Sequence, residues 1–294
     1  MPFDGHDKTK EGLPDHPAGL FYRLWRRLIA PTQKLIVRPY RLAPKGWSTP
    51  MRIAMLSDLH MADPWTPLAR LDDAIARAMA LAPDLILLPG DLIPGPSLVS
   101  TREPPLEEVA ARLGRLRAPQ GVFAVMGNHD WWSDSAAQAR GGGPVASAQA
   151  LEAVGITVLS NRAVPLPNGA WLAGLESQEA IRPSRAEIYG LHDLAGTLDQ
   201  VPEDADTILL AHEPNIFARV PDRVGLTLSG HTHGGQIRFF GWVPLVPREV
   251  DRRYLHGHVT EGARHLVISA GIGYSKIPLR IGALPEVTLV ELNA

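Results

Sequence analysis

Residues 51–60, MRIAMLSDLH, join a short apolar run to a group of polar side chains. An apolar run of this length without alternation is typical of a strand that is covered on both faces. Asp58 and His60 stand where such a strand would end. The same combination, a buried strand with polar residues at its carboxyl end, recurs along the chain.

Nine apolar runs predict strands, and stretches with helical periodicity separate several of them. The predicted strands are residues 52–56, 84–89, 121–126, 156–160, 170–175, 207–211, 225–229, 265–270 and 286–292. The predicted helices are residues 67–83, 104–119 and 147–155. Strands that alternate with helices predict an α/β domain in which the early strands are largely parallel.

The composition indicates a globular protein without thiol chemistry. With 294 residues, 45% of them hydrophobic, the chain can bury a large core. Cysteine is absent, so disulfides and thiolate ligands are excluded, and any metal must be held by His, Asp, Glu or Asn. The formal net charge of -2 gives no sign of nucleic-acid binding, and we expect none.

Two features of the sequence argue for a cytoplasmic protein that does not span a membrane. No segment reaches the roughly 18 consecutive apolar residues of a transmembrane helix. The polar first 19 residues, and the short, interrupted apolar stretch after Arg26 and Arg27, do not form an export signal.

The N-terminal segment, residues 1–50, is predicted to be an extension of a catalytic domain at residues 51–294. Residues 17–52 contain no Asp or Glu, whereas eight Lys and Arg residues lie among them. Residues 20–29, LFYRLWRRLI, predict a helix with an apolar face and an arginine face. Such a helix either binds an anionic membrane surface, through residues 20–41, or packs on its own domain. The apolar segment at residues 239–247, FFGWVPLVP, allows the same two interpretations.

Polar residues that can bind metals or transfer protons follow five of the predicted strands. They are Asp58, His60, Asp91, Asn128, His129, Asp130, His212, His231 and His233. Each one alone could be a helix cap, a turn residue or a core histidine. Because the functional crevice of an α/β sheet lies beyond the carboxyl ends of its strands, we expect these side chains to converge. Carboxylate, amide and imidazole ligands suit two divalent ions such as Mn, Fe or Zn, and a two-metal site favours phosphoester hydrolysis.

The motifs DLH, GDL, GNHD, AHEP and GHTHGG, in this order, resemble those of the calcineurin-like metallophosphoesterases. The resemblance runs from about residue 51 to the C-terminus. GHTHGGQ and the tail GIGYSKIPLRIGALPEVTLVEL are most similar to a bacterial branch that includes membrane-associated phosphodiesterases. The resemblance implies a two-layer β-sandwich flanked by helices, that is, a four-layer α-β-β-α sandwich. It also implies a metal-dependent enzyme that hydrolyses phosphoric esters.

The same resemblance implies a role for each motif residue. The first metal ion would be held by Asp58, His60, Asp91 and His233. The second would be held by Asp91, Asn128, His212 and His231, with Asp91 as the bridge. His129 would act as a general acid or stabilise charge on the leaving-group oxygen. We expect two ions, with Mn favoured over Fe and Zn.

Other residues have two interpretations each. Asp130 either orients the His129 ring or caps the segment that follows GNHD. Trp132, which follows Trp131, either forms a wall of the substrate pocket or belongs to the core. Arg252, Arg253 and Arg280 either clamp a phosphate or lie on the solvated surface.

The sequence therefore predicts hydrolysis of a phosphodiester or pyrophosphate bond. Some relatives in the wider superfamily cleave the pyrophosphate of UDP-2,3-diacylglucosamine, so the resemblance implies this lipid-linked molecule as a candidate substrate. The basic N-terminal segment is consistent with a substrate presented at a membrane. The enzymatic alternative is a soluble phosphodiesterase or phosphatase that acts on nucleotides or other small phosphoesters. A non-catalytic metal-bound scaffold is the alternative from another class, and it is disfavoured because every ligand position is filled and His129 is present. No pattern in the sequence assigns an oligomeric state.

Overall fold

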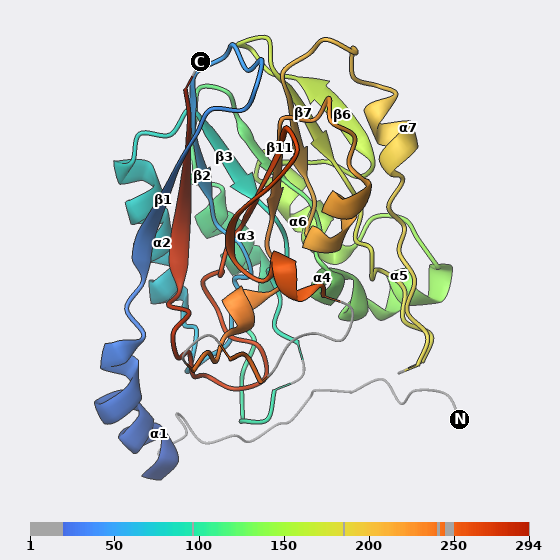
Figure 1. Ribbon diagram of the computed structural model, residues 1–294. Helices are drawn as coiled ribbons and strands as arrows, with labels where there is room; N and C mark the ends of the chain where they lie inside the picture. Colours follow the sequence, from blue (N-terminus) through green and yellow to red (C-terminus); the bar gives the residue numbers. More distant parts are fainter. Residues whose placement is uncertain (1–19, 96, 185, 240–241, 245–249, 294) are drawn as a thin grey trace.

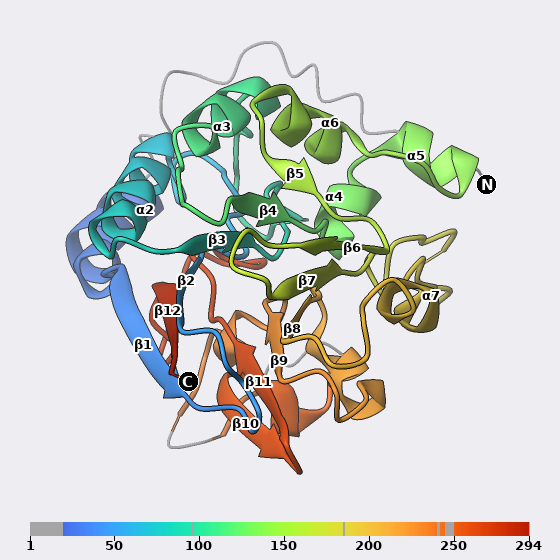
Figure 2. The same ribbon diagram turned by 90° about the horizontal axis from the view of Figure 1, so that it is seen from above.

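Two six-stranded sheets pack face to face, as the computed structural model shows for residues 20–95, 97–184, 186–239, 242–244 and 250–293 (Figure 1). Both sheets are mixed, and helices cover their outer faces, as the view from above shows (Figure 2). The expected layered α/β sandwich is therefore confirmed. Among the described residues, no helix is long and apolar enough to cross a membrane.

The first sheet brings the early strands of the chain to a common edge. In spatial order it contains β1 (Ile36–Leu42), β12 (Glu286–Leu292), β2 (Met51–Met55), β3 (Leu85–Leu88), β4 (Val122–Ala124) and β5 (Thr157–Val158). The four strands β2 to β5 are parallel to one another, as predicted. Their carboxyl ends consequently lie at one edge of the sheet.

The second sheet repeats this arrangement with four parallel strands between two antiparallel edge strands. In spatial order it contains β10 (Gly257–Glu261), β11 (Arg264–Ile268), β9 (Leu226–Ser229), β8 (Thr207–Leu210), β7 (Trp171–Gly174) and β6 (Arg162–Pro165). Each of the nine predicted strands overlaps an observed one. Strands β1, β6 and β10 were not predicted, because these edge strands carry polar side chains and lack a continuous apolar run.

The three helices predicted within residues 51–294 are present, and shorter ones occur at the ends of strands. The α-helices are α1 (Leu20–Leu24), α2 (Leu68–Ala80), α3 (Leu106–Leu113), α4 (Asn128–Trp132), α5 (Ser135–Arg140), α6 (Ala146–Ala153) and α7 (Leu194–Leu198). A π-helical turn, η1 (Trp25–Ile29), continues α1, and η2 (Ala30–Thr32), η3 (Pro214–Arg219), η4 (His233–Gly235) and η5 (Arg252–Tyr254) are 3-10 helices.

Alternation of side chains along the buried strands builds the layers. In β3, Leu85 and Leu87 face the core between the two sheets, whereas Ile86 and Leu88 face the core under α2, α3 and α6. A third core separates the second sheet from α7 and η3 and includes Phe217. Because both faces of β3 are covered by protein, every position of this strand is apolar.

The N-terminal segment is joined to the same fold. We expected residues 1–50 to form an extension outside the catalytic domain, but residues 36–42 form β1, which pairs in parallel with β12. The Trp25 side chain is buried against Trp65 and Tyr274, and its Nε1 donates a hydrogen bond to the carbonyl of Pro278. The described part of this segment therefore belongs to the sandwich. Residues 1–19 lie outside the described residues.

The helix predicted at residues 20–29 is divided between two environments. Trp25 is buried, whereas Leu24 and Leu28 are 47% and 65% exposed. Arg26 and Arg27 are exposed beside these leucines. One part of the expected apolar face therefore packs on the domain, and the other part is open to solvent.

A buried carboxylate, Glu286, ties β1 and β12 to the second sheet. It accepts hydrogen bonds from Arg38 Nε at 2.6 Å and from the backbone N–H of Ala270 at 3.1 Å, and it contacts His256 Nε2 at 3.2 Å. Burial acts to raise the pKa of Glu286, but His256, Ala270 and Arg38 outweigh burial and hold the pKa below its usual range.

Replacing this carboxylate, Glu286→Gln, is expected to lower the free energy of unfolding near neutral pH by about 3 kcal/mol, because Arg38 loses a buried partner. Because its pKa is lower in the folded protein, ionised Glu286 contributes stability at pH values above its pKa in the unfolded chain, about 4.3. This contribution is lost as the pH falls through the pKa of Glu286 in the folded protein. Denaturant titrations at several pH values should therefore show that the difference in free energy of unfolding between wild type and Glu286→Gln shrinks below pH about 4.

The matched control is Glu291→Gln on the same strand. Glu291 pairs with Arg41 and Arg52, and its side chain is partly exposed. Loss of the Glu291 carboxylate should lower the free energy of unfolding by less than about 1 kcal/mol. A Glu286→Gln variant no less stable than the Glu291→Gln variant would contradict the role given to Glu286.

Candidate metal centre

The seven predicted metal ligands meet at the carboxyl ends of β2, β3, β4, β8 and β9. Their donor atoms form a continuous series in which each neighbour lies within 4 Å of the next. The order of the series is Asp58, His233, His60, Asp91, His212, Asn128 and His231. Five loops that are far apart in the sequence thus supply one cluster.

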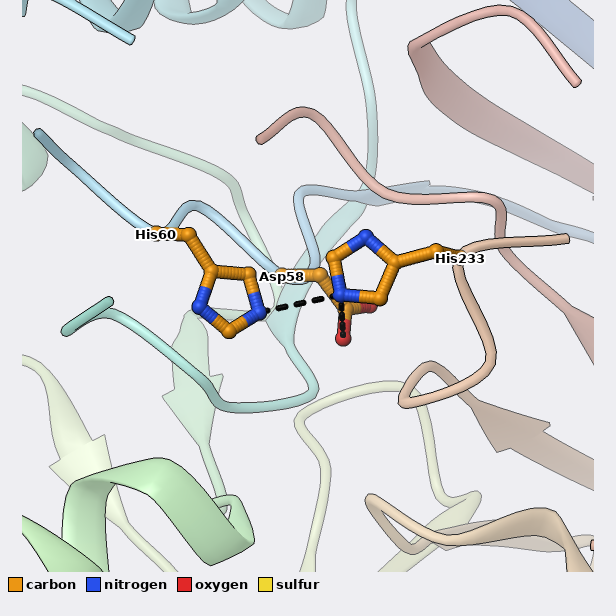
Figure 3. A group of neighbouring side chains, drawn as sticks. All are labelled: Asp58, His60 and His233. Atoms are coloured by element: carbon orange, nitrogen blue, oxygen red, sulfur yellow. Dashed lines mark hydrogen bonds and ion pairs between the residues drawn. The ribbon is translucent and has the colours of Figure 1, made fainter. Parts of the chain in front are cut away.

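The first half of the cluster consists of Asp58, His60 and His233 (Figure 3). His60 Nε2 and His233 Nε2 face each other at 3.0 Å, and His233 Nε2 lies 3.8 Å from Asp58 Oδ1. All three side chains are buried. The group is compact enough for its donor atoms to bind one metal ion.

The second half contains His212, His231 and Asn128. The Oδ1 atom of Asn128 lies 3.2 Å from His212 Nε2 and 3.0 Å from His231 Nδ1. Glu213 also lies near the two histidines, but its carboxylate accepts hydrogen bonds from Ser177 Oγ at 2.5 Å and from the backbone N–H of Gln178.

Asp91 joins the two halves. Its Oδ2 atom lies 3.4 Å from His60 Nε2 and 3.3 Å from His212 Nε2. Its other carboxylate oxygen, Oδ1, accepts a hydrogen bond from the backbone N–H of His129 at 2.9 Å. One oxygen therefore faces both histidines while the other is held by the backbone.

The tautomers of two imidazoles fit a metal site. The Nδ1 atom of His60 lies 3.0 Å from the carbonyl of Ile93, and that of His212 lies 2.7 Å from the carbonyl of Pro89. Because a carbonyl oxygen can only accept, each Nδ1 carries the proton. Each Nε2 is then the atom that faces the cluster, as in metal-binding histidines. Burial acts to lower the pKa of His212, but the Asp91 carboxylate outweighs burial and raises this pKa well above its usual range, so a metal ion would displace a proton from His212 Nε2. Two ligand atoms that each lie about 2.1 Å from one ion are roughly 3.0 to 3.4 Å from each other. The distances of 3.0 Å between His60 Nε2 and His233 Nε2, and of 3.4 and 3.3 Å from Asp91 Oδ2 to His60 Nε2 and His212 Nε2, agree with this range.

The electrostatics of the cluster also suit cations. Burial raises the pKa of Asp58 and raises that of Asp91 to about 7. Burial also lowers the pKa values of His60, His231 and His233 well below the usual range, so these imidazoles are neutral. Buried carboxylates and neutral imidazoles together have an unsatisfied demand for positive charge, which divalent ions would meet.

Backbone strain is concentrated in the same loops. Asp58, His60, Asp91, His231 and His233 all have positive φ values, between 40° and 70°. Such left-handed conformations are uncommon for residues other than glycine and cost free energy. The surrounding sandwich therefore holds these residues in conformations that they would not adopt in an isolated loop.

His129 lies beside the cluster rather than within the series of donor atoms. Its ring contacts the rings of His60 and Trp132, with centroids 5.1 Å and 5.2 Å apart. Burial and the neighbouring histidines lower its pKa to about 3, and the positive charges of Arg182 and Lys276 add to the shift. The ring is therefore neutral and, unlike the buried residues of the cluster, partly open to solvent.

Of the two interpretations of Asp130, the observed contacts are those of a cap. Its carboxylate accepts hydrogen bonds from the backbone N–H groups of Gly127, Asp91 and Leu92 at 2.8 to 3.1 Å. These bonds hold the loop after β3 against the start of α4. Asp130 thus positions Asp91 and Asn128 through the backbone.

Trp132 contacts His129 and is itself held in place. Its Nε1 donates a hydrogen bond to the carbonyl of Glu179, and the guanidinium of Arg182 lies over its ring at 4.5 Å. Trp131, by contrast, is buried and donates a hydrogen bond to Glu176 Oε2. The tryptophan pair is therefore divided between the site and the core.

The three arginines considered as phosphate clamps lie in different surroundings. Arg280 is buried and donates hydrogen bonds to the carbonyls of Gly273 and His233 and to His233 Nδ1, so its guanidinium holds the loop that carries His233. Arg253 is exposed and pairs with Asp251 and Glu261. Arg252 is exposed in the same short helix. The structure brings Arg280 to the cluster and directs Arg253 toward surface carboxylates.

Sequence reasoning missed two polar residues near the cluster. The carboxylate of Glu179 lies 3.8 Å from His231 Nε2, and Glu176 binds Trp131 in the same segment. Both follow β7, a strand that the sequence predicts, so the rule that located the other ligands would have found them. Gly95 was also missed, since no motif marks its approach to His129.

A sandwich whose parallel strands end in buried carboxylates and imidazoles defines a candidate metal-binding protein. The calcineurin-like phosphoesterase family profile matches residues 51–235. The chain belongs to this family, and it is therefore a metal-dependent hydrolase of phosphoric esters.

Several curated proteins are similar over most of the chain. Phosphodiesterase YaeI of Escherichia coli is 34% identical over 265 residues, covering 84% of this chain and 84% of that protein. An uncharacterized metallophosphoesterase of Bacillus subtilis, YkuE, is 31% identical over 262 residues, covering 86% and 82%. A bovine transmembrane protein with a metallophosphoesterase domain is 30% identical and matches 87% of this chain but 55% of its own length.

Gly95 is expected to be required for the position of His129. A Cβ atom at Gly95 would lie 2.0 Å from His129 Cε1, so Gly95→Ala must displace the imidazole. If the ring assists departure of the leaving group, kcat for an aryl phosphodiester should fall about a hundredfold. Steady-state kinetics with a divalent ion would measure this fall.

Two further variants separate this effect from general damage. Gly225→Ala meets no atom closer than 3.4 Å and should leave kcat unchanged. In a His129→Ala background, Gly95→Ala should cause no additional loss, because the clashing ring is gone. An undiminished kcat in the single Gly95→Ala variant would refute the link between the two residues.

Proposed function

We propose that the protein is a dinuclear phosphoesterase that cleaves a phosphodiester or pyrophosphate bond. Asp58, His60, Asp91 and His233 would hold one ion, and Asp91, Asn128, His212 and His231 the other. The observation that carries the proposal is the position of Asp91, whose Oδ2 lies at similar distances from His60 and His212. A shared carboxylate oxygen is what two adjacent ions require.

Residues around the ions would have separate roles in positioning the metal ligands and in stabilising charge. When bound, two divalent ions, with Mn favoured over Fe or Zn, would activate water and neutralise charge at phosphorus. Asp130 holds the loop of Asp91 by accepting hydrogen bonds from the backbone N–H groups of Asp91 and Leu92. The neutral His129 ring beside the cluster would donate a hydrogen bond to the departing oxygen and so stabilise its charge.

Diesters are favoured over monoesters by the likeness to YaeI, which is named as a phosphodiesterase. A lipid-linked diphosphate, with UDP-2,3-diacylglucosamine as the specific candidate, is supported by apolar side chains near the site. In Figure 1, α1 lies at the same end of the molecule as α4, which begins at Asn128. Soluble nucleotides are the alternative substrates.

We further propose that this end of the molecule binds peripherally to the inner face of an anionic membrane through residues 20–41. Leu24 and Leu28 are exposed among Arg23, Arg26 and Arg27, a combination suited to the lipid interface. Leu98 is 80% exposed, and the adjacent Val99 packs in the cluster that contains Trp25. Within the apolar segment 239–247, Phe239 and Trp242 are also exposed, whereas residues 240–241 and 245–247 lie outside the described residues.

Hydrolysis of UDP-2,3-diacylglucosamine tests the proposed function. With Mn²⁺, phosphorus NMR should show UMP and the acylated sugar phosphate. Asp91→Ala should reduce kcat by about a thousandfold, because both halves of the cluster lose a shared ligand. A chelator should abolish turnover, and added Mn²⁺ should restore it.

The contrary outcomes point in different directions. Cleavage of an aryl phosphodiester without cleavage of the lipid would retain the two-metal proposal and assign soluble substrates. Metal binding without hydrolysis of any phosphoester would instead favour a scaffold.

Membrane binding is tested with the double variant Leu24→Ser, Leu28→Ser. It should weaken sedimentation with vesicles of anionic phospholipid at least about tenfold, since each buried leucine contributes roughly 1.5 kcal/mol or more. The control is Ile188→Ser, because Ile188 is an exposed apolar residue in a loop outside residues 20–41. Equal vesicle binding by all three proteins would exclude this surface as the contact.

A further inference from the structure

A recess beside the metal centre is lined by His60 and by two loops. One side is lined by residues that follow β3, namely Pro94, Gly95, Ser97, Val99 and Thr101, and the other by Tyr274, Lys276, Ile277 and Pro278. Trp65, Ser97, Tyr274 and Lys276 contribute its aromatic and polar side chains. Because His60 belongs to both the cluster and the recess, a substrate group in the recess would adjoin the reacting phosphorus.

The hydroxyl group of Tyr274 has an unmet hydrogen-bonding capacity. Tyr274 is 8% exposed, and within the described part of the chain its buried hydroxyl oxygen has no hydrogen-bond partner. A buried hydroxyl without a partner is costly to the fold. Because Tyr274 lines the recess, a ligand with an acceptor oxygen that reached this hydroxyl would satisfy it.

Lys276 supplies a positive charge to the same recess. Its carbonyl accepts hydrogen bonds from Leu98 N–H at 2.8 Å and from Ser97 Oγ at 3.1 Å, which join the two loops. Its backbone is held at a φ of 61°, an uncommon conformation for lysine. Over the described ranges, its exposed side chain forms no salt bridge with a carboxylate.

Aromatic contacts and hydrogen bonds join the wall of the recess to the N-terminal segment. The Trp25 ring lies 5.1 Å from that of Trp65 in an edge-to-face arrangement. Trp65 Nε1 donates a hydrogen bond to the carbonyl of Ser100, and Trp25 Nε1 donates one to Pro278. Each of the two loops is therefore fastened to the aromatic wall.

We propose that this recess is a substrate subsite for a second phosphate group, next to the one that is cleaved. The Tyr274 hydroxyl would donate a hydrogen bond to a phosphate oxygen, and the Lys276 ammonium would pair with its charge. The inference rests on the proposed function and specifies its substrate class as diphosphate diesters. Simple phosphodiesters would leave the hydroxyl and the ammonium without partners, so the enzyme discriminates against them.

The experiment compares two substrates that differ in this second phosphate. UDP-N-acetylglucosamine carries it, and bis(4-nitrophenyl) phosphate does not. Lys276→Gln should reduce the ratio of kcat/KM for the diphosphate to kcat/KM for the aryl diester about tenfold, mainly through KM. Tyr274→Phe should reduce the ratio about threefold. Unfolding temperatures would verify that both variants remain folded.

Lys45→Gln is the matched control. Lys45 is an exposed lysine between β1 and β2, near the edge where β2 begins and thus opposite to the metal centre, so the same charge is removed elsewhere. This variant should leave the substrate ratio unchanged. An equal ratio in wild type, Lys276→Gln and Tyr274→Phe would overturn the subsite.

A binding measurement separates failure of the subsite from failure of the proposed function. The methylene-bridged analogue of UDP-N-acetylglucosamine can be titrated calorimetrically into each protein with Mn²⁺ present. If wild type hydrolyses neither substrate but binds the analogue about tenfold more tightly than Lys276→Gln, the subsite stands and the enzymatic proposal fails. Equal or absent binding in both proteins would overturn the subsite whatever the activity.

Discussion

A single carboxylate oxygen, Oδ2 of Asp91, lies between the two halves of the site, and the surrounding structure serves to hold it there. It faces His60 on one side and His212 on the other. Asp130 fixes the Asp91 backbone, and the His129 N–H fixes the second carboxylate oxygen. Both sheets contribute to this arrangement, since His60 follows a strand of the first and His212 a strand of the second.

The site lowers the free energy of unfolding for two reasons. One is backbone strain, because five of the clustered residues are left-handed. The other is burial of carboxylates, which raises the pKa values of Asp58 and Asp91. Both are sustained by the extensive apolar layers of the sandwich, in which strands such as β3 are buried on both faces. Binding of divalent cations would relieve the electrostatic part of this cost.

The site was more predictable from the sequence than the edges of the fold. Parallel strands end at one edge, so knowing that Asp58 and His212 each follow a buried strand was enough to expect them together. Strand β1 was not predicted, because its pattern is that of an edge strand and its partner lies some 250 positions away. The burial of Arg280 could not be foreseen either, since no local pattern reveals that backbone carbonyls will surround a guanidinium.

The order of strands in the first sheet has a consequence for synthesis of the chain. Strand β12 lies between β1 and β2, so two neighbours in the sequence are separated by a strand that is synthesised long after both of them. Neither can complete its hydrogen bonding until residues 286–292 have left the ribosome. During that interval their open edges are available for wrong pairing. Strands β1 and β2 therefore remain open to mispairing with other chains until residues 286–292 are available.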